Sequence, residues 1–178
     1  MDTKTLFGAL LVAGILGGFA INGFFMDNES LEDNILDVKV GSEAPDFTLR
    51  DSKGNSFNLS DFENEKVVVL EFMNMGCGSC HSFEKEVLKS YCNNATMPED
   101  VEVISLTQTE DVSQEDLEER AEGKNWAYVF GSEEMTDAFG ADRSPSIVII
   151  DKDGIVTFSE SGPMTESELK EKVDEALE

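Results

Sequence analysis

The sequence is poor in basic residues. It has 13 lysines and arginines against 38 acidic residues in a chain of 178, which gives a formal net charge of −25. Binding to nucleic acid phosphates needs patches of lysine and arginine, so this balance argues against a nucleic acid partner. We attribute the acidity to solubility, and the alternative is the steering of basic partners.

Cysteine is too scarce for a small domain held together by disulfides. The three cysteines are Cys77, Cys80 and Cys92, and the first two form a C-x-x-C pair. Residues so close in sequence cannot connect distant parts of the chain, so we interpret this pair as chemical. We expect Cys92, near the end of the first helix, to be a partly buried apolar residue, with an intermolecular disulfide as the alternative.

Only one long apolar run is present, from Leu6 to Met26, with Asn22 as its only strongly polar residue. About 20 apolar residues in a helix span the hydrocarbon core of a bilayer. Lys4 precedes the run and acidic residues follow it, so the positive-inside tendency predicts that the rest of the chain is exported. We predict that 1–26 is a transmembrane signal-anchor, with a cleaved signal peptide as the alternative. The remainder would then be a soluble domain on the extracytoplasmic side.

Beyond this run the sequence divides into a linker and one domain. Residues 27–40 are acidic with few apolar residues, so we interpret them as a tether. The domain is predicted to start at Gly41 and to reach the end of the chain, over 41–178. Strands are predicted within a hairpin over 46–62, over 67–72, 101–107 and 126–130, and in a closing hairpin of 146–151 and 155–160. Helices are predicted from the C-x-x-C pair to about Tyr91, and over 113–123, 132–140 and 165–177. This order predicts an α/β fold, a mixed sheet with helices on both faces.

The C-x-x-C pair follows the buried strand 67–72 directly and opens a helix. At a helix N-terminus, free backbone N–H groups and the helix dipole stabilise a thiolate. Because the thiolate is the attacking species in disulfide exchange, we predict that Cys77 is the nucleophile. Cys80 lies one turn further on the apolar face of the helix, so we expect it to be the shielded, resolving thiol.

Three segments occur in a characteristic order: GSEAPDFTLRDSKGNSFNLSDF from Gly41, VVVLEFMNMGCGSC from Val67, and SPSIVIIDKDGIV from Ser144. Together they resemble the membrane-anchored, thioredoxin-like thiol–disulfide oxidoreductases of the TlpA/ResA family. The resemblance covers 41–178 and implies a thioredoxin-like fold with an extra N-terminal β-hairpin. It also implies a redox-active disulfide between Cys77 and Cys80, with no cofactor and no metal. The partners it implies are cysteine-containing exported proteins and a membrane electron donor or acceptor.

The same resemblance marks a substrate-binding segment far along the chain. Pro145 matches the family's cis-proline, which lies beside the dithiol and helps to bind the substrate chain. Ser144 would then offer backbone groups to a bound peptide. Proline is the residue for which a cis bond is least unfavourable. The alternative is that Pro145 simply opens a strand.

Glu71 lies in the middle of the buried strand 67–72, where many thioredoxins carry a buried acid. A buried carboxylate is unfavourable unless it is protonated or paired. Desolvation should raise its pKa, so we predict that Glu71 accepts the proton of Cys80 during resolution. The alternative is an edge position with the carboxylate facing water.

The sequence departs from the family around the dithiol. The usual aromatic residues before Cys77 are replaced by Met73, Asn74, Met75 and Gly76, and the common proline between the cysteines is missing from Gly78-Ser79. We interpret the methionines, Met75 in particular, either as a pliable substrate-binding surface or as core filler. The changes leave the redox potential open. The direction of exchange is open as well, although the resemblance favours a reductant.

His81 extends the motif to C-x-x-C-H, the pattern of c-type haem attachment. A central buried strand leading straight into the motif leaves little room for a porphyrin. A second alternative is a copper chaperone-like module with Cys77, Cys80 and His81 as ligands. Copper-delivering relatives space their cysteines more widely and use a distant histidine that this chain lacks. Otherwise His81 either favours the Cys77 thiolate from one helical turn away or is exposed to solvent.

Overall fold

The computed structural model describes residues 38–93 and 97–178. The predicted anchor at 1–26 and most of the predicted linker lie outside this range. Within the described range, no helix has the length and apolar character needed to cross a membrane. Val38 was predicted to belong to the linker, but its side chain is buried and its N–H donates to the carbonyl of Ala138. Val38 therefore already packs with the domain that was predicted to start at Gly41.

The described residues form one seven-stranded mixed sheet in the order β2-β1-β5-β4-β3-β6-β7. The strands β3, β4 and β5 are parallel to one another, and the other neighbouring pairs are antiparallel. The bounds are β1 Thr48–Asp51, β2 Ser56–Asn58, β3 Val67–Met73, β4 Val101–Thr107, β5 Ala127–Phe130, β6 Ser146–Ile150 and β7 Val156–Ser161.

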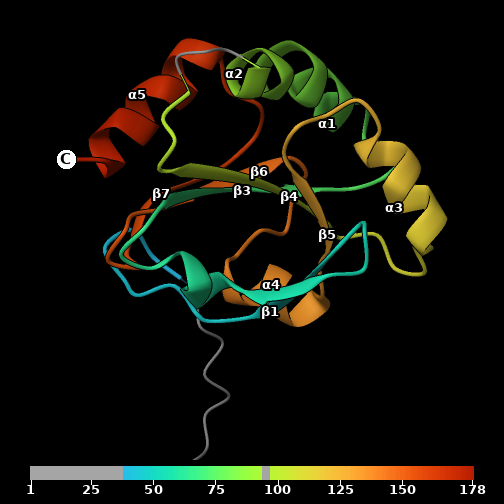
Figure 1. The fold of residues 1–178 in the computed structure, drawn as a ribbon, viewed down its shortest axis with the longest axis horizontal. Helices are drawn as coiled ribbons and strands as arrows, with labels where there is room; N and C mark the ends of the chain where they lie inside the picture. Colours follow the sequence, from blue (N-terminus) through green and yellow to red (C-terminus); the bar gives the residue numbers. More distant parts are fainter. Residues whose placement is uncertain (1–37, 94–96) are drawn as a thin grey trace, which may run out of the picture. The chain divides into compact units, whose positions relative to one another are not determined.

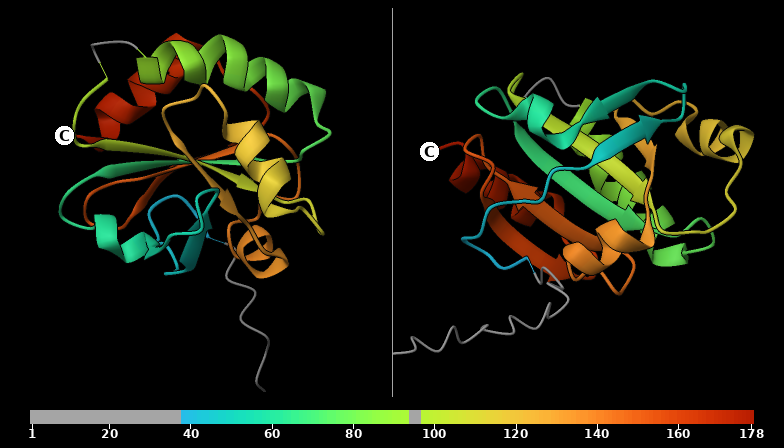
Figure 2. Two further views of the ribbon diagram at one scale, coloured as in Figure 1. Left: turned by 45° about the vertical axis from the view of Figure 1, so that its right-hand side comes forward. Right: turned by 90° about the horizontal axis from the view of Figure 1, so that it is seen from below.

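Helices cover both faces of this sheet. The α-helices are α1 Gly78–Phe83, α2 Lys89–Asn93, α3 Gln114–Ala121, α4 Glu133–Ala138 and α5 Glu166–Ala176, with the 3-10 helix η1 Leu59–Phe62 and the π-helical turn η2 Glu84–Leu88. Helices α1, α2 and α5 lie on one face and α4 lies on the other (Figures 1 and 2). The predicted α/β architecture, a mixed sheet with helices on both faces, is confirmed.

Strand β3 is central because its side chains are apolar on both faces. All seven of its residues are buried, between the parallel β4 and the antiparallel β6. Side chains alternate along a strand, so Val69 and Met73 pack with the helices of one face and Val68 and Phe72 pack on the other. Two cores thus enclose the strand that leads into the C-x-x-C pair.

The predicted N-terminal hairpin is present but shorter than expected. Strands β1 and β2 pair antiparallel, around a turn in which Gly54 has a φ of 85°. The Asp51 carboxylate accepts the N–H groups of Lys53 and Asn55 at 2.8 Å each and stabilises this turn. The hairpin predicted over 46–62 ends at Asn58, because Leu59–Phe62 forms η1, which a capping box between Asn58 and Asp61 starts.

The C-terminal helix α5 begins as the sequence predicts. Thr165 is its N-cap, and Glu168 completes the capping box. Leu169 and Val173 are fully buried on its inner face, in the same core as the helix that follows the C-x-x-C pair.

Candidate active site

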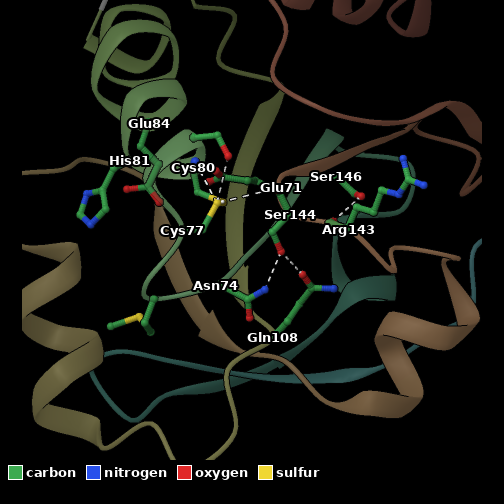
Figure 3. The surroundings of a disulfide bond; sticks show 12 residues. Glu71, Asn74, Cys77, Cys80, His81, Glu84, Gln108, Arg143, Ser144 and Ser146 are labelled. Carbon is green, nitrogen blue, oxygen red and sulfur yellow. Dashed lines mark hydrogen bonds between the residues drawn. A yellow bond between two sulfur atoms is a disulfide. The ribbon is translucent and has the colours of Figure 1, made fainter.

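The predicted cysteine pair lies at the carboxyl end of β3, where the chain enters α1. Cys77 is the N-cap of α1 and is disulfide-bonded to Cys80 (Figure 3). Cys77 is half-buried, whereas Cys80 is fully buried in the core. The pair therefore offers one accessible sulfur and one shielded sulfur, as the pattern predicted.

Two donors point at the accessible sulfur. The Cys80 N–H donates to Cys77 Sγ at 3.1 Å, and the Ser79 hydroxyl lies 3.2 Å from the same sulfur. A disulfide sulfur carries no proton, so it accepts both bonds. After reduction, the same donors would favour a negatively charged Cys77 sulfur.

The predicted cis-proline segment lies against this sulfur. The Ser144–Pro145 peptide bond is cis, and the Ser144 carbonyl oxygen is 3.6 Å from Cys77 Sγ. Pro145 is buried and Ser144 is half-buried. The fold therefore brings Ser144 and Pro145 to the dithiol, although they lie more than sixty residues away in sequence.

A chain of hydrogen bonds ties the cis-proline segment to the loop before the dithiol. The Asn74 side-chain amide donates to Ser144 Oγ at 2.8 Å, and the Ser144 hydroxyl donates to Gln108 Oε1 at 2.5 Å. The Gln108 side-chain amide also contacts the carbonyl of Ala141, and Thr109 Oγ1 lies 3.3 Å from Asn74 Oδ1. Asn74 thus links the end of β3 to the segment that positions Ser144.

The two methionines before the dithiol have different surroundings. Met73 is fully buried in the core, so for Met73 the core interpretation is confirmed. Met75 is half-buried against the same core, and its N–H donates to Thr109 Oγ1 at 2.9 Å. Met75 is therefore partly accessible next to Cys77.

Glu71 is fully buried in the central strand, so the alternative of a solvent-facing edge position is wrong. Its Oε2 accepts the Ser105 hydroxyl at 2.5 Å, and Trp126 Nε1 donates to that hydroxyl oxygen at 2.9 Å. Burial and the nearby Glu84 carboxylate raise the pKa of Glu71 to about 8, against the opposing effect of the Ser105 hydrogen bond. The rise in the pKa of Glu71 has the predicted direction and cause.

Glu71 and Cys80 face the same layer. Along β3, Glu71 is two positions from both Val69 and Met73 and so shares their face of the sheet, and both of these pack in the core that contains Cys80. A carboxyl group with a raised pKa of about 8 is thereby placed on the shielded side of the dithiol.

His81 turns away from Cys77 (Figure 3). Its ring is exposed, as one alternative predicted, but both of its ring nitrogens also contact Nη1 of Arg120. Arginine can only donate, so a ring nitrogen that bonds to it accepts. The predicted alternative in which His81 acts on the Cys77 thiolate has no contact to support it.

The geometry fits poorly with the haem and copper alternatives. Attachment of a haem through both sulfurs would require Cys80 to leave the core in which it is completely buried. Within 38–93 and 97–178, no group of three or more His, Cys, Asp or Glu side chains is placed to hold a metal ion. As expected, Cys92 is buried, in the same core as Cys80, and burial raises the pKa of its thiol to about 12.

Sequence reasoning missed Glu84, Arg120, Asn74 and Gln108. For Glu84 a signal was available, because an acidic residue four positions after Cys80 falls on the buried face of the helix. Asn74 and Gln108 follow the carboxyl ends of two neighbouring parallel strands, which is where α/β sheets place their sites. No local pattern distinguished Arg120 in a helix rich in charged residues.

Comparison with known proteins agrees with this geometry. The Redoxin family model matches residues 39–177. The chain belongs to the Redoxin family. Among curated relatives of this Redoxin, the thiol-disulfide oxidoreductase ResA of Bacillus cereus is 29% identical over 166 residues, which cover 91% of the chain and 88% of the relative. ResA of Geobacillus kaustophilus is 31% identical over 142 residues, which cover 77% and 78%.

Solved structures show the same fold. A thiol:disulfide interchange protein from a Bacteroides species matches this Redoxin with a TM-score of 0.62 at 25% identity, over 78% of the chain and 92% of that protein. The thioredoxin domain of a thiol-disulfide oxidoreductase from Bacteroides vulgatus matches with a TM-score of 0.64 at 24% identity, over 76% and 99%. With the relatives named above, these findings show that the Redoxin described here is a thiol–disulfide oxidoreductase.

Proposed function

We propose that this Redoxin is exported and tethered to the membrane, and that it reduces disulfides in other exported proteins. The observation that carries the proposal is the asymmetry of the dithiol. Cys77 is accessible beside the carbonyl of Ser144, whereas Cys80 is shielded in the core layer that the buried Glu71 also faces. An accessible attacking sulfur and a shielded resolving sulfur suit disulfide exchange with a large substrate.

In the first step the reduced enzyme attacks its substrate. The Cys77 thiolate bonds to one sulfur of the substrate disulfide, and the other substrate sulfur leaves as a thiolate that takes a proton from solvent. The Cys80 N–H and the Ser79 hydroxyl favour the thiolate before attack. Ser144 and Pro145 hold the substrate chain next to Cys77, and Met75 provides an apolar contact beside them.

In the second step Cys80 resolves the mixed disulfide. Glu71 takes the proton of the Cys80 thiol, and the resulting thiolate bonds to Cys77 Sγ. The remaining substrate sulfur leaves as a thiolate, so the substrate gains two electrons and the enzyme is left with the Cys77–Cys80 disulfide. A dithiol partner in the membrane then returns two electrons to the pair, and Glu71 gives up its proton.

Sequence features support the proposed location and direction. The apolar run from Leu6 to Met26, preceded by Lys4, suits a signal-anchor with the domain outside the cytoplasm. The match to proteins named ResA, over most of both chains, favours the reductant of the TlpA/ResA resemblance.

Substrate trapping in cells tests this function. A full-length chain with Cys80→Ser can form the mixed disulfide but cannot resolve it, so we expect exported cysteine-containing proteins to accumulate on Cys77. The matched control, Cys77→Ser, should trap nothing, because Cys80 is buried. Reaction of the wild-type pair in cells with a membrane-impermeant alkylating reagent should show an accessible and mainly reduced Cys77. A pair that stays oxidised, or that the reagent cannot reach in intact cells, would contradict the direction or the location respectively.

A further inference from the structure

Glu84 is a second acidic residue buried close to the dithiol. Its side chain is 1% exposed, at the point where α1 passes into the π-helical turn η2. Glu84 Oε1 accepts from Arg120 Nη2 at 2.8 Å, and Lys124 Nζ lies 3.3 Å from Oε2. One carboxylate and two cations therefore form a largely buried ion group between the active-site helix and the end of α3.

Such a group is a weak source of stability. Removing two or three charges from water offsets much of their attraction, and apolar residues of similar volume would often serve equally well. A buried ion group beside a reactive dithiol is therefore a candidate for a chemical role.

The ion group faces the same layer as the reacting groups. Glu84 lies one helical turn after Cys80, so the two side chains share a helical face. Glu71 points into this layer from β3. The titratable and charged groups that face Glu71 in this layer are Cys80 of α1, Glu84 of η2, Cys92 of α2, Arg120 at the end of α3, Lys124 beyond it, and Tyr128 of β5. The elements α5 and β6 contribute apolar side chains to the same layer.

We propose that Glu84 is a positioning residue for disulfide exchange, and that its charge, balanced by Arg120 and Lys124, determines when Glu71 holds the proton exchanged with Cys80. The proposal rests on the proposed function, in which Glu71 is the proton acceptor. The Glu84 carboxylate disfavours a second negative charge in the same layer, whereas the two cations favour it. Glu71 therefore keeps its proton at low pH. It loses the proton as the pH rises, and the two cations favour this loss.

The direction of each charge effect follows from this geometry. After burial itself, Glu84 is the largest cause that raises the pKa of Glu71, whereas Arg120 and Lys124 lower it. Removal of the Glu84 charge should therefore lower the pKa of Glu71, and removal of the Lys124 charge should raise it. If Glu84 only supported the fold, removal of its charge and removal of the Lys124 charge would not shift the pKa of Glu71 in opposite directions.

The two steps of exchange can be followed separately with an aromatic chromogenic disulfide as the probe. The purified full-length chain is first reduced and then mixed with the probe. Attack by Cys77 on the probe disulfide releases one coloured thiolate, and resolution by Cys80 releases the second. The rate of the second phase should rise with pH as Glu71 loses its proton. In Glu84→Gln we expect this rise to move to lower pH, and in Lys124→Met to higher pH, each by about one pH unit.

Lys85→Met is the matched control. Lys85 is exposed and lines the same surface pocket as Glu84 and Lys124, but it is not among the charges that act on Glu71. Its profile should match the wild type. Lys124 is only partly buried, so Lys124→Met provides the test if Glu84→Gln fails to fold.

The possible results separate the two proposals. Opposite shifts in Glu84→Gln and Lys124→Met, with none in Lys85→Met, would support the role of Glu84. Unshifted profiles in both variants would overturn that role, and if Glu71→Gln still removed the pH dependence, the function of Glu71 would stand. A wild-type chain that releases no second thiolate would instead overturn the proposed function itself.

Discussion

Replacement of Glu71 by glutamine should stabilise the folded protein relative to the wild type, by an amount that increases with pH. Glu71 is completely buried, and its pKa is raised by burial to about 8 from the ordinary value of 4.5. Unfolding exposes the side chain and returns its pKa to the ordinary range. The stability that comes from the protonated form is therefore complete below pH 4.5 and is lost as the pH rises to about 8.

The size of this effect follows from the two pKa values. Each unit of difference between the folded and unfolded states is worth about 1.4 kcal/mol. Ionisation of the unfolded state should then reduce the free energy of unfolding by about 1 to 2 kcal/mol at pH 5.5 and by roughly 5 kcal/mol at pH 8.5. Glutamine does not titrate, and its carbonyl oxygen can still accept the Ser105 hydroxyl, so Glu71→Gln should escape this loss.

Urea unfolding of the oxidised protein at pH 5.5, 7 and 8.5 measures the difference. We expect the free energy of unfolding of Glu71→Gln to exceed that of the wild type by an amount that grows with pH. Glu86→Gln is the matched control, because Glu86 is an exposed glutamate, on the turn η2 that follows the dithiol helix. Its difference from the wild type should stay constant. A Glu71→Gln difference that is equally constant with pH would refute the reasoning about a neutral, desolvated carboxyl group.

Three further substitutions test other parts of the site and the core. Asn74→Ala removes the donor to Ser144 Oγ and should reduce the rate of protein disulfide reduction several-fold, as one hydrogen bond of about 1 kcal/mol implies, with the melting temperature little changed. Ser79→Ala removes a donor to Cys77 Sγ and should slow alkylation of reduced Cys77 near neutral pH by up to about tenfold; an unchanged rate would dismiss the hydroxyl's role. Phe83→Ala empties a fully buried position on the inner face of the dithiol helix and should lower the free energy of unfolding by about 3 to 5 kcal/mol in urea titrations, whereas a loss below 1 kcal/mol would contradict the packing described.

Much of the fold could be predicted because its elements carry strong local signals. The apolar run of β3 is uninterrupted except by Glu71, and Thr165 and Glu168 mark the start of α5 within four residues. The hairpin was over-extended because the apolar alternation continues through Leu59, whereas the Asn58 capping box ends the strand. The end of this strand is therefore determined by local hydrogen bonding and not by hydrophobic periodicity.

The parts of the site that could be predicted are those defined by spacing along the chain, namely the Cys77–Cys80 pair and the acid before it. The resemblance added Pro145. The parts that could not be predicted depend on partners far away in sequence. Asn74 meets Ser144 across 70 residues and Glu84 meets Arg120 across 36 residues, and no local pattern in a single sequence specifies which polar side chains will meet.

The most direct test is a redox titration of the purified full-length chain, with alkylation of free thiols and mass measurement at each potential. We expect a single two-electron transition confined to Cys77 and Cys80. The buried Cys92 should stay unmodified until the protein is unfolded. Cysteines that do not interconvert as a pair, or a transition that involves Cys92 in place of Cys80, would contradict the assignment of the Cys77–Cys80 dithiol as the reacting centre.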